Sequence, residues 1–262
     1  MISKKINKEI KKKLIDRKTI FGGWMSFSDP SIAEMFSSIN LDFVAIDMEH
    51  TSISLEQAKN IISNCNLYNK PCFPRPSSYD KSNLKPILDI GSNGLIATTI
   101  ESCDDVENCL NNLKYPPIGN RSYGVNKAQN YGLAEREYFK NWNNYSSLIL
   151  QIETVKGLND LENILVNFKK YIDGIMIGPY DLSGSMGIPG NLNSPKIIEA
   201  EKYIINLCTK NKISCGTQLS SFDNKIIKNK IKFGYNFLIL GSDLFILKNW
   251  CLETQKLIQK VK

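Results

Sequence analysis

A chain of 262 residues is long enough for one large α/β barrel or two smaller domains, and it can bury a substantial core without disulfides. The formal net charge of +7 comes from lysines scattered among Asn and Ile, which is typical of solvated helix faces rather than of nucleic-acid binding. The seven cysteines form no CxxC pair and no stretch of about 18 apolar residues occurs, so we expect a cytoplasmic protein with buried thiols and no membrane segment.

The first predicted element is a helix in the basic run Lys4–Lys13. Ile6, Ile10 and Leu14 recur there at helical spacing among the lysines. This pattern favours an amphipathic helix packed on a barrel over an arm that binds a membrane or a nucleic acid.

From residue 19 onward, short apolar runs rich in β-branched residues alternate with longer segments of helical period. Such alternation is typical of repeated βα units around a parallel sheet. Eight strands are predicted, at Ile20–Met25, Phe43–Asp47, Cys72–Pro74, Gly94–Ala97, Leu148–Glu153, Gly174–Ile177, Ser214–Gln218 and Phe237–Leu240. Helices are predicted between them, at Pro30–Ile39, Leu55–Tyr68, Asp104–Leu113, Leu158–Phe168, Pro195–Asn211, Lys225–Phe233 and Leu244–Val261.

The number of these elements predicts a closed barrel. Eight strands with intervening helices and no internal linker favour a (β/α)₈ TIM barrel, with residues 1–262 as a single domain, over a doubly wound sheet. The segment Tyr115–Tyr145 breaks the alternation with prolines, glycines, asparagines and aromatics. It predicts a long insertion between strands four and five, and such loops usually serve function or assembly.

Polar residues that end apolar runs are the candidates for chemistry, because the active site of such a barrel lies at the carboxyl ends of its strands. The strand Phe43–Asp47 leads into Glu49 and into His50, the one histidine of the chain. An Asp47–x–x–His50 pair can orient the imidazole and raise its basicity for proton transfer near neutral pH. An Asp47 that caps a loop beside an exposed His50 explains the same residues equally well.

Two further strand ends carry candidate groups. Arg75 follows the third predicted strand, where a rigidly held guanidinium can bind a carboxylate or stabilise an oxyanion, although arginine is also a common surface residue. On the fifth strand, alternation places Gln151 and Glu153 on one face, directed into the barrel. A carboxylate there implies a metal or a bound proton, unless Glu153 is a hydrogen-bonded residue at the outer end of the strand.

The sixth predicted strand ends in the turn Gly178–Pro179–Tyr180–Asp181. This turn allows a close approach of the backbone to a ligand. Asp181 can provide an oxygen ligand for a hard cation such as Mg²⁺. Taken alone, Asp181 is also explained as the N-cap of a helix.

Taken together and in this order, these elements resemble the HpcH/HpaI aldolase family, also called the 2,4-dihydroxyhept-2-ene-1,7-dioate aldolase family. Each motif alone is weak, but the ordered set is specific and extends from about Phe21 to Leu247. The matching stretches are Gly22–Trp24, Asp42–His50, Arg75, Leu88–Gly91, Tyr115–Arg121, Gln151–Glu153 and Ile177–Ser183.

The resemblance implies a phosphoenolpyruvate/pyruvate-type barrel and a class II aldolase, which cleaves or forms a 4-hydroxy-2-oxo acid, with pyruvate and an aldehyde as the other reactants. Glu153 and Asp181 match the positions of the family's ligands for Mg²⁺ or Mn²⁺, and sometimes Co²⁺. The 2-oxo acid completes the coordination, so the metal acts as a Lewis acid on the ketone.

Roles for the other candidates also follow from the resemblance. The Asp47–His50 pair would remove the C4 hydroxyl proton, and Arg75 would help to stabilise the pyruvate enolate. Gln151 would orient the 2-oxo acid, and Glu49 would hold a metal-bound water.

The resemblance further implies how the substrate carboxylate and the subunits are arranged. Backbone amides around Gly178, Pro179, Tyr180 and Asp181 would receive the carboxylate. Members of the family are commonly hexamers, as trimers of dimers, that exchange a helix between subunits. We therefore expect a homo-oligomer in which Asp89 of a neighbouring copy reaches the active site.

The chain departs from the family pattern at the pocket mouth. After Gly94–Ile96 the family often continues with an apolar residue and Pro-Met, whereas this chain has Ala97, Thr98 and Thr99. Tyr180 stands where a small residue is common. These changes leave the aldehyde partner open.

Two other functions also stay open. One is a related citryl-thioester lyase or phosphoenolpyruvate-type enzyme that uses the same metal site. The other is a catalytically silent, oligomeric barrel that binds a 2-oxo acid.

Overall fold

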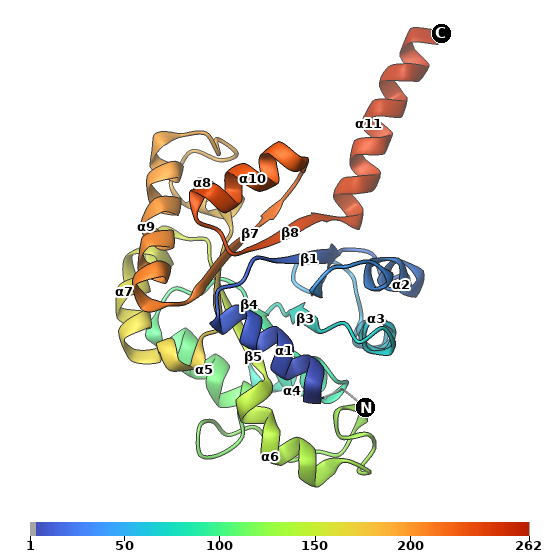
Figure 1. Ribbon diagram of the computed structural model, residues 1–262, viewed down its shortest axis with the longest axis vertical. Coiled ribbons are helices and arrows are strands. Elements are labelled where there is room, and N and C mark those ends of the chain that lie inside the picture. The colour runs from blue at the N-terminus through green and yellow to red at the C-terminus, as the bar shows by residue number, and fades with distance from the viewer. Residues whose placement is uncertain (1–3, 262) are drawn as a thin grey trace.

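A ring of parallel strands lies at the centre of the protein, with helices outside it (Figure 1). The computed structural model describes residues 4–261. Within them, eight strands pair in the order β3-β2-β1-β8-β7-β6-β5-β4. They are β1 (Ile20–Met25), β2 (Phe43–Asp47), β3 (Cys72–Arg75), β4 (Gly94–Ala97), β5 (Ser147–Ile152), β6 (Gly174–Ile177), β7 (Ser214–Leu219) and β8 (Phe237–Ser242). All eight predicted strands are confirmed; four have the predicted bounds, and the other four differ by one or two residues at one or both ends.

Asn93 connects β3 and β4, the two strands at the ends of that order. Its backbone N–H donates to Cys72 O at 3.0 Å, and its side-chain Oδ1 accepts from Cys72 N at 2.8 Å. Its side-chain amide also donates to Asn7 of the first helix. These bonds bring the two edges together, so the predicted (β/α)₈ TIM barrel is confirmed as a nearly closed ring.

The N-terminal helix α1 (Lys4–Ile15) covers the amino-terminal end of the barrel. Leu14 is fully buried in the cluster that fills the interior, and its carbonyl accepts a 2.6 Å hydrogen bond from Ser214 at the start of β7. Lys11 Nζ lies 2.7 Å from an Asp173 carboxylate oxygen, just before β6. The predicted amphipathic helix is therefore confirmed, and the opposite end of the barrel is left for a ligand.

All of the predicted helices are confirmed, with ends that differ by at most three residues, but the structure adds several. The α-helices after α1 are α2 (Pro30–Ser38), α3 (Leu55–Leu67), α4 (Lys81–Asp89), α5 (Cys103–Leu113), α6 (Glu135–Tyr145), α7 (Val155–Phe168), α8 (Pro179–Ser185), α9 (Pro195–Asn211), α10 (Asn224–Phe233) and α11 (Asp243–Val261). Two 3₁₀ turns, η1 (Lys127–Gln129) and η2 (Lys169–Tyr171), join them. The sequence did not indicate α4, which contains Pro86, or α6, which is rich in Asn and aromatics.

The predicted insertion between β4 and β5 is folded around Arg121. The guanidinium carbon lies 4.9 Å from the ring centre of Tyr115 and 4.7 Å from that of Trp142. Arg121 also donates a 2.7 Å hydrogen bond to Asp89, the last residue of α4. Since α4 runs from the carboxyl end of β3 back to the start of β4, this pair lies at the end of the barrel that α1 covers.

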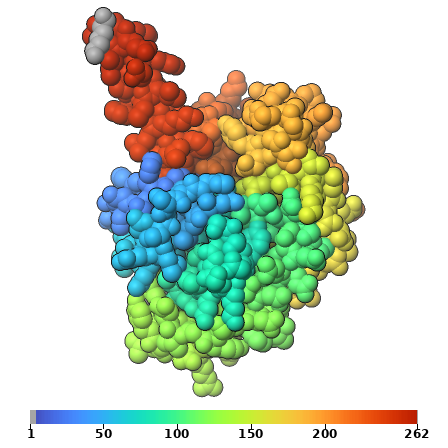
Figure 2. Space-filling model, turned by 180° about the vertical axis from the view of Figure 1, so that it is seen from behind, coloured from blue at the N-terminus to red at the C-terminus, as the bar shows by residue number. Residues whose placement is uncertain are grey.

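The C-terminal helix α11 projects from the barrel as a separate rod (Figures 1 and 2). Of its described residues, Asp243 is the buried one. Leu247, Trp250 and Leu257 are among its exposed apolar side chains, and Trp250 is 63% exposed. No helix within residues 4–261 has the length and apolar character needed to cross a membrane.

Candidate active site

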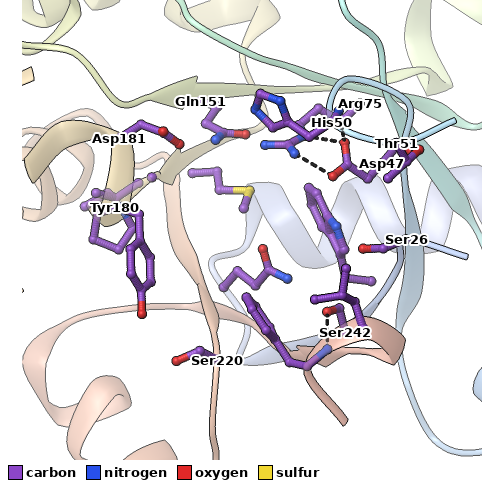
Figure 3. Close-up of a pocket in the computed structure, with 18 residues that line it drawn as sticks. Ser26, Asp47, His50, Thr51, Arg75, Gln151, Tyr180, Asp181, Ser220 and Ser242 are labelled. Carbon is purple, nitrogen blue, oxygen red and sulfur yellow. Dashed lines mark hydrogen bonds and ion pairs between the residues drawn. The ribbon is translucent and has the colours of Figure 1, made fainter. Parts of the chain in front are cut away.

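A cavity of about 290 Å³ opens at the carboxyl ends of the strands (Figure 3). Its walls come from seven of the eight strands, through Trp24, Asp47, Arg75, Gln151, Met176, Gln218 and Ser242. His50, Tyr180 and Asp181 line its mouth. The end of the barrel that sequence reasoning selected is therefore the end that carries the cavity.

Asp47 and Arg75 form the best-defined charged contact in the cavity. They are register partners on the adjacent strands β2 and β3. Arg75 Nη2 lies 2.8 Å from Asp47 Oδ2, and Nε donates to Oδ1 at 3.2 Å. The guanidinium also stacks over Trp24, 4.7 Å from the ring centre. A two-point contact with a flat stacking surface fixes the orientation of the arginine.

His50 faces a different carboxylate from the one expected. Asp47 Oδ1 accepts the backbone N–H groups of Glu49 and His50, at 3.1 and 3.2 Å, so Asp47 fixes the turn after β2. The imidazole Nε2 instead lies 3.5 Å from Glu49 Oε2. Asp47 therefore caps the loop and His50 is exposed, as the alternative interpretation of the sequence expected. The role of His50 as a base stays a prediction.

Glu49 connects three other groups of the site. Its Oε2 lies 3.3 Å from Arg75 Nη1 and 2.9 Å from the Thr98 hydroxyl, which follows β4. Partial burial raises the pKa of Glu49, and the positive charge of Arg75 opposes part of that shift. Glu49 is thus held among the strand ends rather than directed into solvent.

Glu153 is buried at the end of β5, on the face that alternation predicted. It is 4% exposed, and its Oε2 accepts a hydrogen bond from the Gln151 amide. Its Oε1 accepts from Thr98 Oγ1 at 2.8 Å, Thr99 N at 2.8 Å and Thr99 Oγ1 at 3.0 Å. Gln151 Oε1 is buried and has no hydrogen-bond partner among residues 4–261, so it can accept from a ligand.

The turn after β6 approaches Glu153 closely because Gly178 has no side chain. A Cβ placed on Gly178 would lie 2.8 Å from Glu153 Oε2 and 3.0 Å from Gln151 Nε2. Gly178 is the N-cap of α8, so Asp181 lies in the first turn of that helix instead of capping it. Asp181 is exposed, and Figure 3 shows it beside Gln151 at one rim of the cavity.

Glu153 and Asp181 are the two carboxylates that the sequence predicts as metal ligands, and that role stays a prediction. No group of three His, Cys, Asp or Glu side chains that could hold a metal occurs within residues 4–261. The two carboxylates follow the ends of the neighbouring strands β5 and β6. Mg²⁺ is commonly bound in this way, by one or two carboxylates, with water and substrate oxygens as the other ligands.

The charge balance of the site also fits a cation. Asp47, Glu49, Glu153 and Asp181 lie in or beside the cavity, while Arg75 is its one Lys or Arg lining residue within the described chain. An anionic ligand would meet excess negative charge there unless a cation or protons compensate.

Asp89 does not line the cavity of its own chain. It is buried at the covered end of the barrel with Arg121. The expectation that a neighbouring copy supplies Asp89 to the site stays a prediction.

Sequence reasoning named Thr98 and Thr99 as a departure from the family pattern but gave them no role at Glu153. Both follow β4 directly, so the rule about polar residues at strand ends could have indicated that role. Gln218 and Ser220, at the end of β7, are cavity residues that the same rule could have found.

The fold and the cavity together define a (β/α)₈-barrel enzyme with its active site at the carboxyl ends of the strands. A profile of the family described as HpcH/HpaI aldolase/citrate lyase matches residues 21–249. The chain therefore belongs to the HpcH/HpaI aldolase/citrate lyase family, a family of carbon–carbon lyases.

Individual relatives agree with this assignment. The chain is 28% identical over 246 residues to 2-keto-3-deoxy-L-rhamnonate aldolase of Salmonella typhi, covering 92% of this chain and 89% of the relative. The enzyme of the same name from Klebsiella pneumoniae is 26% identical with the same coverage. The crystal structure of the HpcH/HpaI aldolase from Desulfitobacterium hafniense superposes with a TM-score of 0.86, at 24% identity and over 95% of this chain and 96% of that one, so the fold is shared.

Gly178→Ala is expected to destabilise the protein by about 1–3 kcal/mol, because the new Cβ must displace Glu153 and Gln151. Urea unfolding measures the change. Gly184→Ala in the same helix is the control, since its Cβ would meet nothing within 4 Å, and helix propensity predicts a gain of about 0.5–1 kcal/mol. Equal stability of the two variants would contradict the packing described for Gly178.

Proposed function

We propose that this chain is a divalent-metal-dependent aldolase that cleaves, or forms, a 4-hydroxy-2-oxo acid, with pyruvate and an aldehyde as the other reactants. The observation that carries the proposal is the pair Glu153 and Asp181, which follow the adjacent strands β5 and β6 beside a cavity that also holds Arg75. The printed names of the relatives support aldol chemistry on a 2-oxo acid.

Glu153 and Asp181 would hold Mg²⁺ or Mn²⁺, with Co²⁺ as an alternative. When bound, the cation would polarise the ketone of the 2-oxo acid and offset the negative charge that develops on cleavage. The backbone N–H groups of Tyr180 and Asp181, in the first turn of α8, would receive the substrate carboxylate, since Pro179 has no N–H and the Gly178 N–H donates to Ile152 O.

Arg75, His50 and Gln151 would act on the substrate directly, and their neighbours would hold them in position. Arg75 is held rigid by Asp47 and Trp24, so its guanidinium would stabilise the enolate without reorientation. His50 would accept the C4 hydroxyl proton, directly or through water, with Glu49 beside its imidazole and Asp47 fixing its loop. Gln151 Oε1, which lacks a partner among residues 4–261, would accept a hydrogen bond from a substrate hydroxyl.

Removing the metal is expected to abolish pyruvate release from 4-hydroxy-2-oxo acids, and Mg²⁺, Mn²⁺ or Co²⁺ should restore it. Glu153→Gln should lower kcat/KM on the order of 10²–10³-fold, because a Lewis acid contributes several kcal/mol. The measurement is pyruvate release coupled to lactate dehydrogenase.

Glu162→Gln is the matched control, because Glu162 is exposed on α7 and should leave the rate unchanged. Release that is indifferent to chelator and to Glu153→Gln would overturn the metal mechanism. If the protein binds pyruvate but cleaves none of a set of 4-hydroxy-2-oxo acids, the alternative of a catalytically silent barrel that binds a 2-oxo acid would be favoured.

The wall of the cavity opposite Arg75 carries neutral hydrogen-bonding groups, which suit an uncharged, hydroxylated aldehyde. Ser220 and Ser242 lie across from Asp181, Gln151 and Arg75 (Figure 3). Gln218 lines the cavity on β7 next to Ser220. These neutral groups can exchange hydrogen bonds with substrate hydroxyls, whereas Arg75 is already paired with two carboxylates.

A 4-hydroxy-2-oxo acid that yields a neutral hydroxyaldehyde should be cleaved at least about 10-fold more efficiently than one of equal length that yields a carboxylated semialdehyde. Gln218→Leu should narrow this ratio and leave pyruvate methyl exchange unchanged, since the pyruvate half lies on the opposite wall. The measurement is kcat/KM for both substrates. A preference for the carboxylated substrate would contradict the proposal.

We also propose that the protein is a homo-oligomer in which α11 packs against a second copy, with a hexamer as the family expectation. Leu247, Trp250, Leu257 and Val261 recur at helical spacing, and all four are exposed. The first turn of α11 supplies Leu244 and Phe245 to the cavity. The position of α11 against a second copy would therefore affect the shape of the active site.

Trp250→Glu should reduce the molar mass measured by light scattering towards that of a single chain, because a charge would enter an apolar interface. Gln255→Glu introduces the same charge on the same exposed helix and should leave the mass unchanged. A wild-type protein that is monomeric at micromolar concentration would contradict the proposal.

A further inference from the structure

Thr98 and Thr99 bring two hydroxyl groups to the buried carboxylate of Glu153. Both follow β4, and both donate to Glu153 Oε1, at 2.8 and 3.0 Å. In the pattern of the resembled family, this stretch often reads Pro-Met, neither of which has a hydroxyl. The contact is therefore a property of this chain's own residues.

The Thr98 hydroxyl lies between two carboxylates. Its oxygen is 2.8 Å from Glu153 Oε1 and 2.9 Å from Glu49 Oε2. One hydroxyl has one proton and can donate it to one of them at a time. Glu49 Oε2 already faces Arg75 and His50, whereas no basic side chain among residues 4–261 forms an ion pair with Glu153. Glu153 therefore lacks the compensating charge that Glu49 has, and we assign the hydroxyl proton of Thr98 to the hydrogen bond with Glu153.

Thr99 adopts a backbone conformation that its side chain disfavours. Its φ is 48°, in the left-handed region, where a β-branched residue is rare. In this conformation both its N–H and its hydroxyl reach Glu153 Oε1, at 2.8 and 3.0 Å. Strained residues of this kind persist where surrounding contacts hold them, and here those contacts converge on one carboxylate oxygen.

We propose that Thr98 and Thr99 are positioning residues that occupy Glu153 Oε1 and leave Oε2 as the oxygen that binds the metal. This inference rests on the proposed function. Oε1 accepts from three donors, which occupy both of its lone pairs, whereas Oε2 accepts from one, so Oε2 is the oxygen with capacity left for a cation. Oε2 accepts from Gln151 and lies against Gly178, at the turn that leads to Asp181.

Mn²⁺ binding tests this proposal directly. The free-Mn²⁺ signal in electron paramagnetic resonance titrations gives the affinity of the purified protein, with and without pyruvate. Thr98→Val/Thr99→Val, which keeps the shapes and removes both hydroxyls, should bind Mn²⁺ about 10–100-fold more weakly, the usual cost of losing groups that orient a metal ligand. Thr98→Val alone should show part of that loss.

Thr98→Ser is the matched control, because it retains the hydroxyl and should keep wild-type affinity. For the double variant, kcat measured at saturating Mn²⁺ should return to near the wild-type value, since the threonines act on metal binding and not on the reacting atoms. A residue with only a structural role would lower stability without moving the Mn²⁺ affinity.

The outcomes separate the two proposals. A wild-type protein that binds no Mn²⁺ would overturn the proposed function itself. A wild-type protein that binds Mn²⁺ with the same affinity as the double variant would overturn the role of Thr98 and Thr99 and leave the proposed function intact.

Discussion

The buried carboxylate of Glu153 is the constraint on which the rest of the active site depends. It is 4% exposed, and no Lys, Arg or His among residues 5–261, whose side chains the structure describes, forms an ion pair with it. Burying a charged group is costly unless hydrogen bonds and opposite charge compensate. Thr98, Thr99 and Gln151 supply the hydrogen bonds, and Gly178 leaves the space. These residues follow or belong to β4, β5 and β6, which the parallel barrel brings together.

The one arginine that lines the cavity is paired with other carboxylates and does not compensate the charge of Glu153. Arg75 is fixed by Asp47, its register partner on β2, and by Glu49 and Trp24. It therefore presents a rigid positive charge on one wall of the cavity. A divalent ion held by Glu153 and Asp181, as proposed, would add positive charge on the side of the cavity that carries Gln151 and Arg75, across from Ser220 and Ser242.

Much of this arrangement could be predicted because it depends on strand pattern alone. Alternation placed Gln151 and Glu153 on one face, and polar strand ends identified Asp47 and Arg75. Contacts that depend on loop backbone could not be predicted. The imidazole of His50 faces Glu49 because Asp47 binds the loop amides, and Thr99 reaches Glu153 through a positive φ that nothing in its residue type indicates. Helices α4 and α6 were missed because Pro86 and an Asn-rich composition obscure their periodicity.

The most direct test of the account is deuterium exchange of the pyruvate methyl protons, followed by NMR. It reports enolate formation without requiring the correct aldehyde. The account predicts exchange with Mn²⁺ or Mg²⁺ present, loss of exchange in chelator, and loss in Glu153→Ala even with the metal. Exchange that continues at the wild-type rate in Glu153→Ala and in chelator would contradict it.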